Sequence, residues 1–337
     1  MPRPFAPELD HASEGSAGHV SESAMIRQIL AVVGRRPGVQ VGIGDDAAVL
    51  DGEPAWIVAH DMLVEDVHFR WSTHSAADVG HKALAVNLSD IAAMGARPIA
   101  VIVGLASPSG ALGDREIRDM YRAMEELAEP TGCSIVGGDI SRARETVIGI
   151  TVMGQMAAGV TPVLRSGARP GNAVYVTGPI GASVAGRTLL EEPTAHTGPR
   201  DAGLIHAHRR PMPRLAFGTE LAALGATAMM DISDGLALDA QRLALASGVR
   251  IVLDLDRVPL AEGVADIAHH IGIDPAVFAS TGGEDYELLV TIEPARIEGT
   301  QIPLTQVAIV TDGRPGLELS RNGRPIRLAR LGWDHIG

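Results

Sequence analysis

The sequence predicts an α/β or α+β protein built from two domains. The chain has 337 residues, which is longer than most single domains. Segments with strand-like and helix-like hydrophobic patterns alternate through both halves, as in proteins that pack helices against sheets. Between the halves, residues 157–172 break the pattern with glycines and prolines. We therefore expect a flexible tail at 1–20, an N-terminal domain at 21–157 and a C-terminal domain at 158–337.

The first half is predicted to contain three helices and five strands. The helix at 76–94 is apolar on most of its faces and is closed by Gly95 and Pro98, while the strand at 99–106 is continuously apolar. The expected helices are 22–33, 76–94 and 114–128, and the expected strands are 39–43, 55–59, 99–106, 134–136 and 146–156.

The second half repeats this alternation after the break. A segment with two prolines and a glycine, 192–200, is predicted to be a mobile loop. The expected strands are 173–177, 228–232, 250–255, 288–292 and 307–310, and the expected helices are 182–191, 202–209, 213–225 and 236–247.

Charge and hydropathy restrict the classes of function that the chain can have. The formal net charge is -13, which argues against nucleic acid or an anionic membrane as a partner. The chain has no run of about 18 apolar residues and no signal-peptide pattern at its start, so we expect a cytoplasmic protein. An acidic protein that handles phosphates would need bound cations to offset the repulsion.

The rarity of lysine and cysteine excludes several mechanisms. Lys82 is the only lysine, and because it stands between His81 and Ala83 it cannot belong to a P-loop. Schiff-base chemistry is excluded unless Lys82 itself performs it. Cys133 is the only cysteine, so no disulfide can form within the chain, and its neighbours indicate the start of a buried strand.

Five short acidic motifs are the main functional signal. They are GIGDD (42–46), NLSD (87–90), GGD (137–139), DISDG (231–235) and GGEDYE (282–287). Any one of them could be an ordinary turn. Most follow the end of a predicted strand or lie on a helix, and each sets carboxylates beside glycine or a small polar residue. Mg²⁺ prefers such oxygen ligands and binds triphosphates through shared carboxylates, so together they predict a metal–phosphate site.

Several of these side chains also have a structural interpretation. Ser233 or Asp234 could be the N-cap of the helix that starts at Leu236. His68 could be a structural histidine. The apolar neighbours of Asp90 indicate that it is buried or part of a site rather than solvated.

Arginines offer a second candidate signal. Arg165 and Arg169 lie in the Gly/Pro-containing break, where a guanidinium could hold a phosphate or simply be solvated.

Six segments, in this order, resemble the thiamine-monophosphate kinase family: GIGDDAAVL, ALAVNLSDIAAMGARP, IVGGD, RSGARPGNAVYVTG, DISDGLALD and GGEDYELL. That family is part of the superfamily of the ATP-using aminoimidazole ribonucleotide synthetases. The resemblance covers residue 21 to the end and is highly specific as a combination. It implies ATP-dependent phosphorylation of thiamine monophosphate to thiamine diphosphate, a homodimer formed by the N-terminal α/β domain, which would hold metal and ATP, and no P-loop.

The resemblance also assigns roles by position. The metal ligands of the family correspond to Asp46, Asp61, Asp90, Asp139, Asp231 and Asp234. Its ATP contacts correspond to Tyr121, Gly138, Asp139, Arg165 and Ser233. Its thiamine phosphate contacts correspond to His68, Glu284 and Trp333. The residues expected to act directly in catalysis are Asp46, Asp61, Asp90, Asp139 and Asp234.

This chain departs from the family pattern in two places. Ala59-His60 replaces the usual hydroxyl residues before Asp61, although the backbone carbonyl of His60 could still bind metal. Ser21-Glu22 replaces the usual Gly-Glu. Neither change removes a carboxylate.

The implied mechanism is in-line transfer assisted by several Mg²⁺ ions, with no strong general base because the attacking phosphate oxygen is already ionised.

The sequence also leaves alternative functions open. They are a sister synthetase resembling the aminoimidazole ribonucleotide enzyme, a non-catalytic metal-binding protein and a metal-dependent phosphatase. Selenophosphate synthetase and the hydrogenase-maturation relatives are disfavoured because the cysteine or lysine they need is missing from the expected position.

Overall fold

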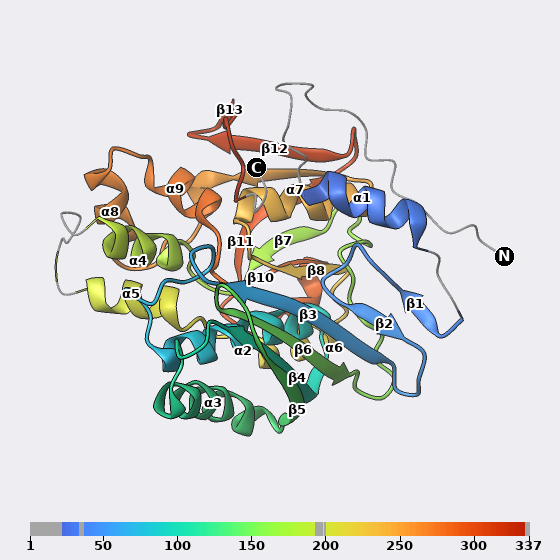
Figure 1. Ribbon diagram of the computed structural model, residues 1–337. Helices are drawn as coiled ribbons and strands as arrows, with labels where there is room; N and C mark the ends of the chain where they lie inside the picture. The colour runs from blue at the N-terminus through green and yellow to red at the C-terminus, as the bar shows by residue number, and fades with distance from the viewer. Residues whose placement is uncertain (1–21, 34–36, 193–197, 199, 334–337) are drawn as a thin grey trace.

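The computed structural model describes residues 22–33, 37–192, 198 and 200–333. The predicted tail at 1–20 and most of the predicted loop at 192–200 lie outside these residues. Two sheets form the framework, one in each half of the chain (Figure 1). The strand orders are β1-β2-β3-β6-β4-β5 and β13-β12-β9-β11-β7-β10-β8. Both sheets are mixed, since β4–β5 and β12–β9 are parallel pairs among antiparallel ones, which confirms the predicted class of two α/β halves.

The first half alternates strands with two long helices. Its strands are β1 (Val39–Val41), β2 (Ala48–Leu50), β3 (Trp56–Val64), β4 (Arg97–Ser107), β5 (Ser134–Arg142) and β6 (Val147–Gln155). Its helices are α1 (Glu22–Val32), α2 (Ala76–Ala93) and α3 (Asp114–Ala128), followed by a 3-10 turn at Glu129–Thr131.

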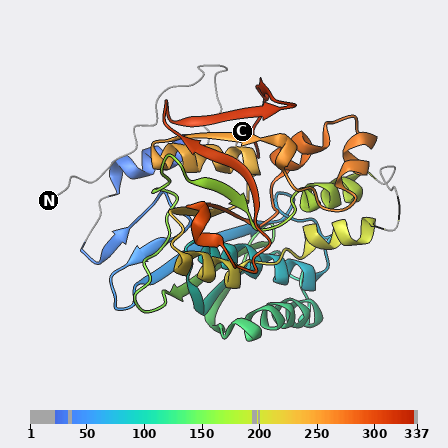
Figure 2. The same ribbon diagram turned by 180° about the vertical axis from the view of Figure 1, so that it is seen from behind.

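The second half has shorter elements. Its strands are β7 (Ala173–Val176), β8 (Ala228–Asp231), β9 (Arg250–Asp254), β10 (Leu288–Ile292), β11 (Thr305–Thr311), β12 (Gly316–Arg321) and β13 (Arg324–Ile326). Its helices are α4 (Ala182–Glu191), α5 (Asp201–Arg209), α6 (Leu215–Leu224), α7 (Leu236–Ser247), α8 (Val264–His270) and α9 (Pro275–Gly282), with 3-10 turns at Leu255–Arg257 and Pro294–Ile297. Seen from behind, the orange and red strands of this half lie above the teal and green helices of the first (Figure 2).

Helix α2 is the element at which the two halves meet. It packs on β3, β4 and β6 of the first sheet and also contacts α6 and β8 of the second half. Its last residues, Ala92 and Ala93, share an apolar cluster with Leu221 and Met229. A β-carbon on Gly218 of α6 would lie 2.0 Å from the carbonyl oxygen of Ala92, so only glycine permits this approach. Residues on α2 are therefore held against both halves.

Two strands are longer than predicted, which changes the position of two acidic residues. The strand expected at 55–59 is β3, so Asp61 lies inside a strand rather than after one. The strand expected at 134–136 is β5, which runs through Asp139. Their polar residues are accommodated because β3 pairs with β6 along its whole length, whereas β5 is an exposed edge strand. The expected strand ends at residues 59 and 136 were therefore wrong, because β3 continues to Val64 and β5 to Arg142.

The described helices include none that is both long enough and apolar enough to cross a membrane.

Candidate functional site

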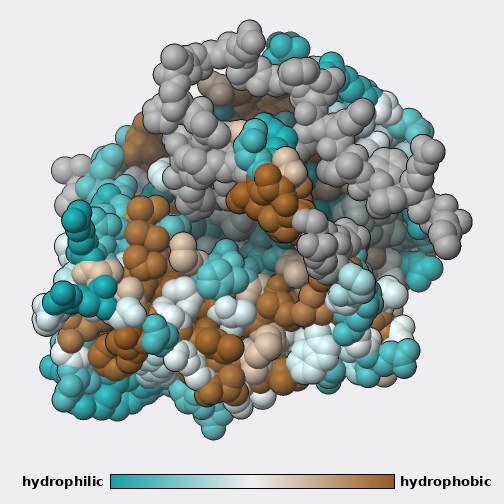
Figure 3. Space-filling model, turned by 45° about the vertical axis from the view of Figure 1, so that its right-hand side comes forward, coloured by the Kyte–Doolittle hydropathy of each residue, from teal (hydrophilic) through white to brown (hydrophobic). Residues whose placement is uncertain are grey.

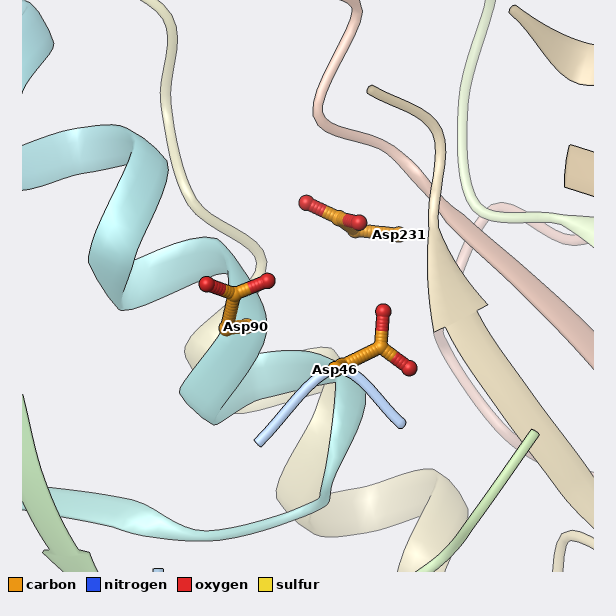
Figure 4. A group of neighbouring side chains, drawn as sticks. All are labelled: Asp46, Asp90 and Asp231. Atoms are coloured by element: carbon orange, nitrogen blue, oxygen red, sulfur yellow. The ribbon is translucent and has the colours of Figure 1, made fainter. Parts of the chain in front are cut away.

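Three aspartates from distant segments meet where the two halves join. Asp46 precedes β2, Asp90 lies on α2 and Asp231 ends β8. One carboxylate oxygen from each lies within 4.8 Å of the other two, and the three side chains point into one common space (Figure 4). We call these three residues the acidic cluster. It gathers side chains from three of the five predicted motifs.

The acidic cluster carries repelling charges in a poorly solvated place. Burial raises the pKa of Asp90 well above its ordinary value, and the charges of Asp61 and Asp231 raise it further. Burial and the charge of Asp46 likewise raise the pKa of Asp231, although the Ser89 hydroxyl donates a hydrogen bond of 2.6 Å to its Oδ2. A cation in this space would relieve both effects.

Arg165 supplies one positive charge to this region. Its Nη2 donates to Oδ1 of Asp46 at 2.9 Å and its Nε to Oδ2 at 3.1 Å, a bidentate pair. Its backbone N–H also donates to the carboxylate of Asp45. The Asp46 side chain is fully buried and that of Arg165 is 23% exposed, so the interpretation of Arg165 as a solvated loop arginine was wrong.

Asp61 lies beside the acidic cluster, whereas the side chain of His60 does not. The backbone N–H of Asp61 donates to Oδ1 of Asn87 at 2.8 Å, which ties β3 to α2. Successive residues of a strand face opposite sides of the sheet. The His60 imidazole accordingly lies with the exposed hydroxyl of Thr151, with 2.9 Å between Nδ1 and Oγ1. Only the backbone carbonyl of His60 therefore remains a candidate ligand.

The DISDG segment begins α7 differently from the expected capping. The helix has Gly235 as its N-cap residue, and Oδ2 of Asp239 accepts hydrogen bonds from the backbone N–H groups of Asp234 and Gly235. Neither Ser233 nor Asp234 is the cap, so that alternative was wrong. The buried Asp234 carboxylate instead contacts the guanidinium of Arg242, which also donates to Asp239.

Three of the predicted ATP contacts lie together in a hollow that does not include the acidic cluster. Tyr121 of α3 and Gly138 and Asp139 of β5 line a hollow of about 490 Å³ together with Ile135, Val136, Gly137 and Ile140. The Ser141 hydroxyl donates to Oδ2 of Asp139 at 3.1 Å.

Asp139 does not join the acidic cluster. The strand register aligns Asp61, Ile150, Val103 and Gly138 in one row across the sheet, and Asp139 belongs to the next row. Neighbouring rows face opposite sides, and three strand spacings amount to about 14 Å.

The predicted substrate residues include one tightly paired carboxylate. Glu284 lies before β10, with its Oε1 2.7 Å from Nζ of Lys82 and its Oε2 3.2 Å from Nδ1 of His208. Lys82 also donates to the backbone oxygen of His68 at 3.2 Å. A role for Lys82 in the site was not predicted from the sequence. The available signal was a single lysine inside a helix that is apolar on nearly every face.

Trp333, the third predicted substrate residue, has two cationic neighbours. The guanidinium carbons of Arg187 and Arg330 each lie 5.2 Å from the centre of its ring. Its backbone N–H donates to the carbonyl oxygen of Asp234 at 2.9 Å. Trp333, the last of the described residues, is thereby attached to the DISDG segment.

Comparison with known proteins places this geometry in a class. Residues 44–156 match the family model "AIR synthase related protein, N-terminal domain", and residues 169–296 match its C-terminal counterpart. The chain, with its two mixed sheets and the acidic cluster at their junction, is thus an AIR synthase related protein.

Individual relatives narrow the class to one family. The chain is 37% identical over 314 residues to the thiamine-monophosphate kinase of Bacillus subtilis (strain 168), covering 88% of this chain and 94% of the relative. It is 40% identical over 277 residues to that of Mycobacterium tuberculosis (strain CDC 1551 / Oshkosh), covering 80% of each. The solved structure of AaThiL complexed with AMPPCP and TMP superimposes with a TM-score of 0.83 at 31% identity, over 94% of this chain and 97% of that one. The chain belongs to the thiamine-monophosphate kinase family and is a phosphotransferase with a phosphate group as acceptor.

Proposed function

We propose that the protein transfers the γ-phosphate of ATP directly to thiamine monophosphate, forming thiamine diphosphate. The observation that carries this proposal is the acidic cluster, built from three distant segments in a chain of the thiamine-monophosphate kinase family. AaThiL, which shares this fold, was solved complexed with AMPPCP and TMP.

Mg²⁺ is the cation that we propose for the acidic cluster. The donors are carboxylate oxygens, which suit a hard cation, and the raised pKa values of Asp90 and Asp231 reflect a repulsion that a cation offsets. The further ligands proposed here are the carboxylates of Asp61 and Asp234 and the backbone carbonyl of His60. The proposed role of Asp139 as a metal ligand would require a separate ion, because Asp139 lies in a neighbouring row of the sheet that faces the opposite side. When bound, Mg²⁺ would neutralise phosphate charge so that two anionic substrates can approach.

The protein's own residues would then bind and orient the substrates. Arg165, which pairs with Asp46, and Ser233, which follows Asp231 by two residues, would contact the ATP phosphates. Tyr121 and Gly138 would contact ATP at the hollow between α3 and β5. His68, Glu284 and Trp333 would hold the thiamine side. The attacking oxygen of a phosphate acceptor is ionised at neutral pH, so orientation suffices without a general base.

A coupled assay for ADP with ATP and Mg²⁺ tests this function. We expect ADP to form only when thiamine monophosphate is present, together with an equal amount of thiamine diphosphate. ADP formed without any acceptor would contradict the proposal and favour a sister synthetase or a phosphatase. Metal binding without ADP formation under either condition would favour a non-catalytic protein.

We also propose that two copies associate through the exposed face of the first sheet. Helices α2 and α3 cover the other face, whereas Met62 and Ile102 on this face are 52% and 42% exposed. Apolar side chains lie in groups across the lower half of the space-filling view (Figure 3), where the first sheet lies in Figure 1. Exposed apolar surface of this kind is typical of an interface. Light scattering should give twice the chain mass of 35.2 kDa; a mass equal to one chain would contradict the dimer.

Replacing Trp333 with alanine tests the thiamine side. The backbone of Trp333 is attached to the DISDG segment, and its half-buried ring is proposed to stack on the substrate's aromatic rings. We expect Trp333→Ala to raise KM for thiamine monophosphate by about tenfold, a loss of ~1.4 kcal/mol, with a smaller effect on KM for ATP. Trp56→Ala is a control for loss of an aromatic ring elsewhere, since Trp56 is 37% exposed at the start of β3. An equal rise in both KM values for Trp333→Ala would indicate a packing role instead.

A further inference from the structure

Lys82 occupies an unusual place for a lysine. Its side chain is completely buried in α2, at the junction of the two halves. Its Nζ donates to Oε1 of Glu284 at 2.7 Å and to the backbone oxygen of His68 at 3.2 Å. A buried ammonium therefore contacts both a residue of the first half and a residue of the second, and these are two of the three residues proposed to bind the thiamine side.

A histidine holds the other oxygen of the same carboxylate. Nδ1 of His208 lies 3.2 Å from Oε2 of Glu284 and 3.0 Å from the hydroxyl of Ser183. Burial and the charge of Lys82 lower the pKa of His208, so its imidazole is neutral at pH 7. It can offer Glu284 a hydrogen bond without adding a second charge. The positive charge in this group of side chains thus comes from Lys82.

Lys82 makes Glu284 electrostatically different from the carboxylates of the acidic cluster. Burial by itself favours the neutral acid, but the Lys82 ammonium and the contact with His208 outweigh it and hold the pKa of Glu284 well below its ordinary value. The pKa values of Asp90 and Asp231 are instead raised, because these side chains are buried and their nearest charges are other carboxylates. Glu284 therefore stays ionised while its charge is matched inside the protein. It remains an acceptor with little attraction for a divalent ion.

The backbone of Glu284 is fixed on the opposite side. Its φ of 60° lies in the left-handed region, which is uncommon for a residue with a side chain. Its backbone N–H donates to the carbonyl oxygen of Ser233 at 2.7 Å, and Ser233 is a proposed ATP contact. The Ser233 carbonyl and the Lys82 ammonium together therefore determine where the carboxylate of Glu284 points.

We propose that Lys82 is a positioning residue for the phosphate acceptor. It holds the Glu284 carboxylate, ionised, and the His68 segment in the arrangement that binds thiamine monophosphate, without touching either substrate. This inference rests on the proposed function. It implies that losing Lys82 weakens binding of thiamine monophosphate much more than binding of ATP, and that this effect acts through Glu284.

Steady-state kinetics of Lys82→Met tests the selectivity. Methionine keeps most of the length of the side chain and removes the charge. We expect KM for thiamine monophosphate to rise by about tenfold or more while KM for ATP changes by less than about twofold. The matched control is Arg210→Gln, which breaks another ion pair between α2 and the second half, with 2.6 Å between Nε of Arg210 and Oδ1 of Asp78. This control should change neither KM selectively.

A double variant tests whether Lys82 acts through Glu284. We expect Glu284→Gln and Lys82→Met/Glu284→Gln to have KM values for thiamine monophosphate within about threefold of each other, because both lack the ion pair. The double variant should also unfold at a higher temperature than Lys82→Met, which leaves a buried carboxylate without its cation. If Lys82→Met does not fold, the comparison of the other two variants still decides the question.

Three results would overturn the inference. They are an unchanged KM for thiamine monophosphate in Lys82→Met, equal rises for both substrates as after general loosening of the junction, and additive effects in the double variant. Wild-type protein that forms no thiamine diphosphate would instead overturn the proposed function, and the inference with it. Wild-type turnover therefore distinguishes the two failures.

Discussion

Asparagine in place of Asp90 is expected to abolish turnover and, at the same time, to make the metal-free protein harder to unfold. The first effect follows because Asp90 is a member of the acidic cluster and the amide has no charge to offer a divalent cation. A thousandfold loss of kcat is expected, which corresponds to about 4 kcal/mol of transition-state stabilisation. The coupled ADP assay measures it.

The second effect follows from the electrostatics of the metal-free cluster. Burial and neighbouring carboxylates raise the pKa of Asp90, so the folded state binds a proton more tightly than the unfolded state does. Such a group destabilises the fold increasingly as the pH rises above the unfolded pKa, and the destabilisation is absent below it. In EDTA at pH 8, Asp90→Asn should therefore raise the melting temperature by at least about 2 °C, and the difference should shrink towards pH 5.

Asp66→Asn is the matched control. Asp66 is 75% exposed and has a positive φ, which asparagine also tolerates, so this substitution removes a carboxylate outside the acidic cluster without backbone strain. Neither turnover nor melting temperature should change appreciably. Near-normal turnover of Asp90→Asn would remove Asp90 from the proposed metal site. A lower melting temperature in EDTA would contradict the account of the cluster as a set of repelling charges.

The motifs and the family resemblance marked six aspartates as candidate metal ligands, but they could not show which of them meet, since Asp139 lies apart in the register of the sheet. Asp46, Asp90 and Asp231 do converge, although their role as ligands stays a prediction. Helix α2 was predicted almost to the residue because its long apolar pattern is bounded by Gly95 and Pro98. A long periodic segment can therefore be predicted from its local sequence alone.

Elements whose stability comes from distant pairing could not be predicted. The strands β2, β12 and β13 and the helices α8 and α9 are three to eight residues long, too short for a periodic pattern. Strand β3 continues through the polar residues His60 and Asp61 because β6 pairs with it along its whole length. The residues of β3 alone do not indicate that β6 will pair with it. The same holds for β5, which continues beyond two glycines because it is paired with β4.

The counter-ions of the site were also invisible in the sequence. Arg165 reaches Asp46, and Lys82 reaches Glu284, across long separations in the chain. A motif shows that a carboxylate is present, but only the fold shows whether a cation neutralises it. That distinction separates Glu284, which Lys82 neutralises, from Asp90 and Asp231, whose nearest charges are other carboxylates.

Glutamine in place of Arg165 is expected to destabilise the metal-free protein strongly, and bound Mg²⁺ should reverse part of the loss. The substitution leaves the fully buried Asp46 carboxylate without its bidentate partner. Breaking a buried ion pair from one side typically costs about 3–5 kcal/mol, which would lower the melting temperature by roughly 6 °C or more in a chain of this size. A divalent cation at the acidic cluster would supply the missing positive charge, so the gap between variant and wild type should narrow in saturating Mg²⁺.

Melting curves in EDTA and in Mg²⁺ provide the measurement, with Arg169→Gln as control because Arg169 is exposed in the same segment. Arg165 is proposed to bind ATP, so the variant should also show a raised KM for ATP even where Mg²⁺ restores its stability. That separation is the informative result, since it distinguishes the charge that stabilises the empty cluster from the contact that holds the nucleotide. A variant as stable as wild type in EDTA would mean that Asp46 does not depend on Arg165. A gap that stays equally wide in Mg²⁺ would argue against a cation bound at Asp46.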